Sequence, residues 1–154
     1  MILVTVGSSL PFDELVEAID RFVENGSIAD RVTCQIGHGK YLPRHCEYFR
    51  FTPNLDPYIK GAGVVIGHGG TGTVSELLAD GKSFVAVPNP HVQDDHQAVF
   101  LERLSRVVPL LWTRDLADLP RLVGQARQFR LAARPGEKLT DDLRAYLLRG
   151  ARPL

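Results

Sequence analysis

Short apolar runs rich in β-branched residues alternate with segments of helical period along this chain of 154 residues. The expected strands are residues 2–6, 32–36, 48–51, 64–66, 84–87 and 107–111. The expected helices are residues 12–23, 73–79, 93–104 and 116–129, with a short one in "TPNLDPYIK". Because parallel strands are joined by right-handed crossovers, this order predicts an α/β fold: a Rossmann-like, doubly wound parallel sheet of about six strands.

The length and the 44% hydrophobic content fit one compact domain, which we place at residues 1–130. Residues 131–154 are expected to form a helical tail. Its apolar stripe consists of Leu139, Leu143, Tyr146 and Leu147, beyond Pro135-Gly136. The stripe has two interpretations that the sequence leaves open, packing on its own sheet or contact with a partner.

Charge and cysteine content exclude several classes of protein. Eighteen basic and eighteen acidic residues cancel, which argues against nucleic acid as a partner and against a polybasic membrane patch. Cys34 and Cys46 lack zinc-site spacing, so reduced thiols in a cytoplasmic protein are expected. No run of about 18 apolar residues, the length that a membrane span needs, occurs.

Ligands bind such sheets beyond the carboxyl ends of the strands, and distinctive loops follow several strands here. These loops are "GSS", "GHG", "GHGGTGT" and "PNPHVQDDHQ". Four of the six residues from Gly67 to Gly72 are glycine, immediately before a helical pattern. Glycines let a ligand approach the backbone, and the amides and dipole of a helix N-terminus favour an anion, so we expect a phosphate there. Tight turns alone are the competing explanation, and the spacing matches neither GxGxxG nor a Walker motif.

Several polar residues in these loops have a structural and a ligand-binding interpretation. Thr73 and Glu76 fit an S/T-x-x-E capping box, and Asp94 with Gln97 fits the start of the next helix. His68 is placed to donate to a phosphate or to satisfy a loop carbonyl. The other four histidines are His96, on the first turn of its helix, and His38, His45 and His91, which are expected on the surface or in loops. None has metal-ligand spacing with another, so no metal site is expected.

The order of residues after the fourth strand resembles the donor-site signature of GT-B glycosyltransferases that use UDP-sugars. The residues that carry it are His68, Gly70, Thr71, Thr73, Glu76, Gly81, Pro88, Asp95 and Gln97. It is most similar to the C-terminal domain of glycosyltransferase family 28. The short length, "VTVGSSLPFDELV" and "DDHQ" further resemble the small cytosolic subunits of two-part glycosyltransferases, those of dolichol-linked GlcNAc transfer and of bacterial exopolysaccharide synthesis. The resemblance extends from Met1 to about Phe129.

The resemblance implies a site for the donor and a single GT-B half. It implies that Gly70–Thr73 hold the diphosphate with Gly7–Ser9 nearby, that Phe51–Leu55 form the uracil pocket, and that Glu76 binds the ribose. His96 and Gln97 would face the sugar. The complete implied set is Gly7, Ser8, Ser9, Phe51, Thr52, Leu55, His68, Gly69, Gly70, Thr71, Gly72, Thr73, Glu76, Pro88, Asp95, His96 and Gln97.

The implied function is that of a donor-binding subunit in a two-subunit, inverting UDP-sugar glycosyltransferase without cofactor or metal. Because Ile2 already begins the donor-domain sheet, a membrane-anchored partner is expected to bind the lipid-linked acceptor of exopolysaccharide or glycan synthesis. It would also supply the general base, with His68 as the alternative, and recruit this cytoplasmic chain to the cytoplasmic face of the membrane. His96-Gln97 replaces two glutamines of bacterial relatives, and Gly72 a larger residue, which leaves the sugar and the diphosphate contacts open. The alternatives are a half domain like UDP-GlcNAc 2-epimerase and a non-catalytic nucleotide-sugar-binding module.

Overall fold

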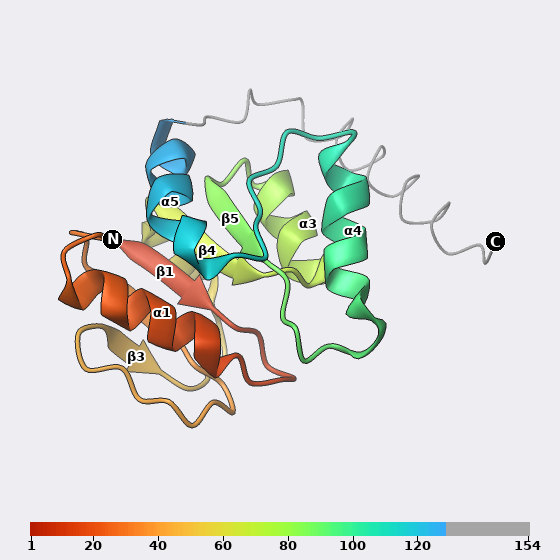
Figure 1. The fold of residues 1–154 in the computed structure, drawn as a ribbon. Coiled ribbons are helices and arrows are strands. Elements are labelled where there is room, and N and C mark those ends of the chain that lie inside the picture. Colours follow the sequence, from red (N-terminus) through yellow and green to blue (C-terminus); the bar gives the residue numbers. More distant parts are fainter. Residues whose placement is uncertain (129–154) are drawn as a thin grey trace.

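A computed structural model describes residues 1–128 as five parallel strands flanked by helices (Figure 1). The strands are β1 (Ile2–Thr5), β2 (Val32–Gln35), β3 (Glu47–Phe49), β4 (Val64–His68) and β5 (Phe84–Val87). They lie in the order β3-β2-β1-β4-β5. Strand β1 pairs with β2 on one side and β4 on the other, so the strand order reverses direction between β1 and β4. A doubly wound parallel sheet opens a crevice at this position.

The helices cover both faces of the sheet, which confirms the predicted fold class (Figure 1). They are α1 (Asp13–Glu24), α2 (Asp56–Gly61), α3 (Thr71–Ala79), α4 (His96–Ser105) and α5 (Leu119–Gln128), with short 3-10 turns at Gln93–Asp95 and Leu116–Asp118. Strand residues alternate between the two cores. Val4 and Ile66 pack on the side of α1 and α5, whereas Leu3 and Val65 pack on the side of α3 and α4.

The sixth strand predicted at residues 107–111 does not form. Instead the segment touches the sheet at a single bridge between Ala86 and Trp112, where Ala86 N donates to Leu111 O. Pro109 lies inside the predicted strand, and proline has no N–H to donate to a ladder. The apolar run therefore reaches the edge of β5 without extending the sheet.

A buried aspartate on α1 organises the loop between β2 and β3. The Asp20 carboxylate, 2% exposed, accepts hydrogen bonds from Tyr41 Oη at 2.8 Å, Arg44 N at 3.0 Å and His45 N at 2.7 Å. Burial by itself raises the pKa of Asp20, but these donors outweigh it and hold the pKa below its ordinary value. The hydrogen bond from Tyr41 to Asp20 raises the pKa of the Tyr41 hydroxyl to about 12. The loop is thus anchored by a charge that the sequence pattern did not reveal.

The two cysteines are free thiols, with Cys34 buried and Cys46 half-buried beside the same core. A hydrogen bond with Cys46 and burial raise the pKa of the Cys34 thiol, so it stays protonated. No helix among residues 1–128 is both long and apolar enough to span a bilayer. The predicted tail at 131–154, its apolar stripe and Phe129 lie outside the described residues.

Candidate functional site

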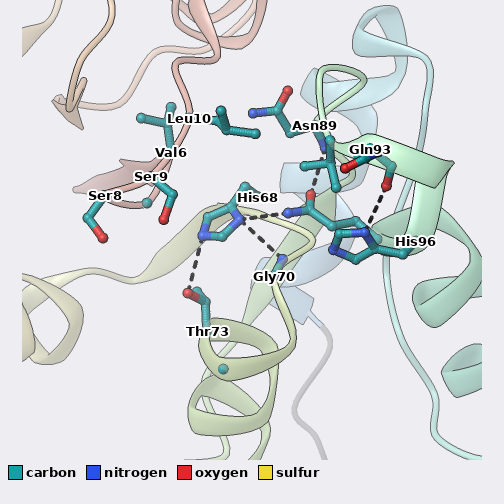
Figure 2. Close-up of a pocket in the computed structure, with 14 residues that line it drawn as sticks. Val6, Ser8, Ser9, Leu10, His68, Gly70, Thr73, Asn89, Gln93 and His96 are labelled. Atoms are coloured by element: carbon teal, nitrogen blue, oxygen red, sulfur yellow. Dashed lines mark hydrogen bonds between the residues drawn. The ribbon is translucent and has the colours of Figure 1, made fainter. Parts of the chain in front are cut away.

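A pocket of about 560 Å³ lies where β1, β4 and β5 end, at the reversal of strand order (Figure 2). It is formed by the three segments that follow these strands. Its lining residues are Val6, Gly7, Ser8, Ser9, Leu10, His68, Gly70, Gly72, Thr73, Asn89, Val92, Gln93, His96 and Gln97. The crevice rule for parallel sheets, stated from the sequence alone, thus identifies the same edge as the geometry.

Helix α3 begins at the pocket with an uncapped N-terminus. Gly70 is the N-cap, in extended conformation, and no side chain of residues 1–128 caps the helix. The first helical bond runs from Val74 N to Gly70 O at 3.0 Å, so the amides of residues 71–73 have no acceptor within the helix. These donors and the positive end of the helix dipole make the turn a site suited to an anion.

The capping-box interpretation of Thr73 and Glu76 is wrong. The helix starts at Thr71, two residues earlier than predicted, so Thr73 is its third residue and cannot be the cap. Glu76 is exposed, and its side chain makes no hydrogen bond or ion pair within residues 1–128. Glycine is accepted at the N-cap about as well as threonine, so Gly70 can begin the helix. The S/T-x-x-E template therefore placed the start of the helix two residues too late. Glu76 is left with a free carboxylate on the surface of α3.

The glycines of this turn, and Gly7 in the neighbouring loop, have two different structural roles. A Cβ on Gly7, whose φ is 79°, would lie 2.6 Å from His68 Nε2, and a Cβ on Gly70 would overlap the same ring. A Cβ on Gly69 would lie 2.7 Å from Leu101 Cδ1. Gly72 differs, because a Cβ there would meet nothing within 4 Å. Three of these glycines therefore make room for the protein's own side chains, and Gly72 faces open space.

The imidazole of His68 lies at the centre of the pocket wall, held from three directions (Figure 2). Its Nδ1 is 3.2 Å from Gly70 N and 3.4 Å from Gln97 Nε2, and its Nε2 is 3.4 Å from Thr73 Oγ1. Burial lowers the pKa of His68, which favours the neutral ring. His68 thus joins the N-terminal turn of α3 to α4.

Asn89 is a site residue that sequence reasoning missed. The residue is only 3% exposed, and its side-chain Nδ2 donates to Pro11 O at 3.0 Å. Its backbone N donates to Gln97 Oε1 at 2.9 Å. Asn89 therefore ties the segment after β1 to the segment after β5. The only signal in the sequence is an amide between two prolines, in "PNP".

The predicted cap at Asp94 is also wrong. Helix α4 begins at His96, and Asp94 and Asp95 before it have φ values of 60° and 52° in the left-handed region. The carboxylate of Asp95 pairs with Arg114 at 2.8 Å. Gln97 is buried, with both ends of its amide bonded inside the protein.

His96 contributes a second imidazole to the pocket wall, with a different orientation. Its Nδ1 lies 2.9 Å from Gln93 O. A carbonyl oxygen only accepts, so Nδ1 carries the hydrogen and Nε2 of the neutral ring bears the lone pair. His96 is exposed, which leaves this nitrogen accessible from the pocket.

The pocket brings together about half of the residues expected from the sequence. Those that line it are Gly7, Ser8, Ser9, His68, Gly70, Gly72, Thr73, His96 and Gln97. The expected residues that do not line it are Phe51, Thr52, Leu55, Gly69, Thr71, Glu76, Pro88 and Asp95. Phe51 lies at the same edge of the sheet, where its exposed ring meets His38 at 4.9 Å between centroids. Among residues 1–128, no group of three or more His, Cys, Asp or Glu side chains is arranged to hold a metal ion.

Comparison with known proteins identifies the class of domain that this fold and pocket define. The family model of the glycosyltransferase family 28 C-terminal domain matches residues 1–114. The chain therefore belongs to this family.

The curated relatives are larger proteins or subunits. The chain is 30% identical over 128 residues to the UDP-N-acetylglucosamine transferase subunit ALG13 of Yarrowia lipolytica, covering 75% of this chain and 65% of the relative. It is 29% identical over 148 residues to the human ALG13 subunit, covering 88% and 12%. It is 29% identical over 136 residues to the UDP-N-acetylglucosamine–N-acetylmuramyl-(pentapeptide) pyrophosphoryl-undecaprenol N-acetylglucosamine transferase of Solibacter usitatus, covering 73% and 37%. The chain spans less than two thirds of the length of each.

Solved structures share the fold. The crystal structure of the glycotransferase of kitacinnamycin has a TM-score of 0.65 at 23% identity, covering 99% of this chain and 43% of that one. The NMR structure of ALG13 has a TM-score of 0.55 at 16% identity, covering 87% and 88%. The chain is thus a Rossmann-like half of the GT-B type, as the sequence predicted.

Proposed function

We propose that this chain binds the UDP-sugar donor of an inverting glycosyltransferase and works as the donor-binding subunit of a two-subunit enzyme. The observation that carries the proposal is the uncapped N-terminus of α3 opening into the pocket at the β1/β4 reversal. A diphosphate suits this position because backbone amides and a helix dipole converge there. The family supplies the reaction class, and the relatives named as UDP-N-acetylglucosamine transferases make UDP-GlcNAc the first donor to test.

The diphosphate is assigned to the turn Gly70–Thr73, through the free amides of residues 71–73, with Gly7 and the hydroxyls of Ser8 and Ser9 approaching from the neighbouring loop that lines the same pocket. His68 donates to the same anion. Gly69 and Pro88 shape the backbone beneath it: Gly69 N is bonded to Val87 O at 3.0 Å, and a Cβ on Gly69 would lie 3.3 Å from Pro88 Cα.

The remaining roles follow the course of the sheet edge. The uracil is assigned to Phe51, Thr52 and Leu55, which follow β3 on the same side of the reversal as β1. Glu76 accepts from the ribose hydroxyls with its free carboxylate. His96 faces the sugar, with Asp95 and Gln97 beside it.

In the proposed reaction, an acceptor hydroxyl attacks the anomeric carbon on the side opposite the UDP. A new carbon–oxygen bond forms, the bond from the anomeric carbon to the diphosphate oxygen breaks, and the acceptor proton passes to a general base on the partner. The charge that develops on the leaving diphosphate is stabilised by the α3 amides and dipole. This mechanism uses no cofactor or metal ion for that charge.

A membrane-anchored partner is proposed to bind a lipid-linked acceptor and to bring this chain to the cytoplasmic face of the membrane, for glycan or exopolysaccharide synthesis. Two relatives are themselves named as subunits, which supports a divided enzyme. At the pocket rim Leu10 is 42% exposed, an apolar side chain available to such a partner. Residues 1–130 are proposed as the donor domain, with residues 131–154 as a further contact.

The test has two stages. Calorimetry of the purified chain should show UDP binding, and adding a single-span membrane protein encoded beside it should start transfer from UDP-GlcNAc to a lipid-linked acceptor. Binding without transfer with every such partner would favour a nucleotide-sugar-binding module. Conversion of UDP-GlcNAc without acceptor would favour an epimerase. Robust transfer by the isolated chain would contradict the two-subunit proposal.

A further inference from the structure

The orientation of the Gln97 side-chain amide is determined by a backbone donor. Asn89 N lies 2.9 Å from Oε1, and a backbone N–H can only donate. The atom that faces it must therefore be the carbonyl oxygen. The amide nitrogen Nε2 is consequently turned toward His68 Nδ1, 3.4 Å away, and approaches it as a donor.

A second backbone donor reaches the same nitrogen. Gly70 N lies 3.2 Å from His68 Nδ1, with a geometry that places its hydrogen toward the ring. A neutral imidazole has one nitrogen that donates and one that accepts. Two donors share the lone pair of Nδ1 in a three-centre arrangement, so the ring hydrogen belongs on Nε2.

We propose that Gln97 is a positioning residue that holds His68 in the tautomer with its hydrogen on Nε2. The imidazole then presents a donor to the pocket. Nε2 lies 3.4 Å from Thr73 Oγ1, and the threonine hydroxyl accepts this hydrogen and keeps its own for a ligand oxygen. Gln97, His68 and Thr73 thus form a chain of hydrogen bonds that points donors toward the anion site. The benefit to a diphosphate rests on the proposed function, whereas the tautomer does not.

This assignment changes the roles of two residues expected from the sequence. A general base needs a lone pair that faces the substrate, and the lone pair of His68 is taken by Gly70 and Gln97. His68 is therefore a donor in the site and not the general base. Gln97, expected to contact the sugar, has its oxygen and nitrogen engaged inside the protein.

The tautomer can be read directly in the ligand-free full chain by side-chain ¹⁵N–¹H NMR, with the His68 signals assigned by their loss in His68→Asn. The expected pattern is an unprotonated Nδ1 and a protonated Nε2. Gln97→Glu keeps the acceptor for Asn89 N but places a carboxylate oxygen against Nδ1. That acceptor should draw a proton onto Nδ1, so the His68 pattern should change to the Nδ1-protonated or doubly protonated form.

Gln93→Glu is the matched control, because it adds the same charge to the rim of the same pocket at a residue with no contact to His68. Because the hydrogen-bond partners of the His68 ring among residues 1–128 are Gly70, Thr73 and Gln97, Gln93→Glu should leave the His68 pattern unchanged. If Gln97→Glu does not fold, Gln97→Met retains the length without a donor, and an increased Nδ1–H population is expected. An Nδ1–H ring in the wild type, or an unchanged pattern in the folded Gln97 variant, would overturn the proposal. UDP titration is separate: loss of UDP binding with the tautomer intact refutes the proposed function alone.

Discussion

The imidazole of His68 occupies the space into which a Cβ atom on Gly70 would project. The glycine at position 70 is therefore required by a ring of the same protein, and not by a ligand alone. Replacing Gly70 with valine would test the phosphate site predicted from the sequence, but it would also displace His68. A loss of UDP affinity would then have two causes, the blocked phosphate position and the moved imidazole. Gly72 offers a cleaner test, because a Cβ there meets nothing within 4 Å.

Gly72→Leu should lower UDP affinity by at least about tenfold, which is about 1.4 kcal/mol. A Cβ at position 72 meets no protein atom of residues 1–128 within 4 Å, and the residue lines the pocket, so the new side chain should extend into it. The melting temperature should not fall, since glycine costs a helix roughly 1 kcal/mol relative to better helix formers. Calorimetry and thermal unfolding test both statements. Gly124→Leu, at a helical glycine with the same free space on α5, should leave UDP affinity unchanged. Equal affinity of Gly72→Leu and wild type would place UDP elsewhere.

Glu76→Gln should weaken UDP binding by about 1 to 3 kcal/mol, because a carboxylate that accepts from ribose hydroxyls loses its charge. The melting temperature should hardly change, since the Glu76 side chain makes no hydrogen bond or ion pair within residues 1–128 and does not cap α3. Isothermal titration beside thermal unfolding separates the two effects. Glu102→Gln removes an exposed charge from α4 and should leave affinity unaltered. Unchanged UDP affinity in Glu76→Gln would remove Glu76 from the site.

His96→Ala should reduce UDP-sugar turnover in the assembled enzyme by at least about tenfold, or about 1.4 kcal/mol of barrier. Free UDP binding should persist, because His96 is assigned to the sugar. His91→Ala is the matched control, since His91 lies in the loop that leads into α4 but pairs with Glu14 at 2.7 Å, outside the pocket lining. Steady-state turnover and UDP calorimetry provide the two readouts. A loss of UDP binding as large as the loss of turnover would contradict the assignment.

Asp20→Asn should destabilise the fold by about 1 to 3 kcal/mol at neutral pH, because one amide oxygen cannot satisfy three donors. The folded pKa of Asp20 is depressed, so its stabilisation is present above the ordinary value of 3.8 and is lost as pH falls from there through the folded pKa. Urea unfolding across that range should show a shallower pH dependence in Asp20→Asn. Asp80→Asn, an exposed change, should follow the wild type; an identical slope in Asp20→Asn would contradict the prediction.

Local pattern was sufficient to predict five parallel strands of the sheet and the edge that carries the pocket. Buried strands such as β1 and β4 are short runs rich in β-branched residues, and the glycine-rich turn must follow one of them. The error at residues 107–111 came from reading apolar character without weighing Pro109. The start of α3 was misplaced because this stretch offers two N-caps: Thr73, which the S/T-x-x-E template selects, and Gly70, which the structure shows.

The hydrogen bonds inside the site were beyond sequence reasoning because their partners are far apart in the chain. Asn89 Nδ2 meets Pro11 O across 78 positions, and Gln97 meets His68 across 29. No periodicity encodes such pairs, since they arise only when separate strand ends converge. The resemblance pointed to three of the segments that form the pocket but assigned each residue to the ligand, whereas several of these residues bond to one another.

Every residue that lines the pocket lies in the segments after β1, β4 and β5 or at the ends of those strands, and Val6 is the one lining residue that also belongs to a core cluster of the described residues. Binding and folding therefore depend on largely different side chains. A directed-evolution library at Val92, Gln93 and His96, which are partly or fully exposed, should accept many substitutions without loss of soluble protein. Selection for a new donor can then use substitutions at these three positions alone. Asn89, Gln97 and His68 stay unchanged, because their hydrogen bonds hold the segments of the pocket together.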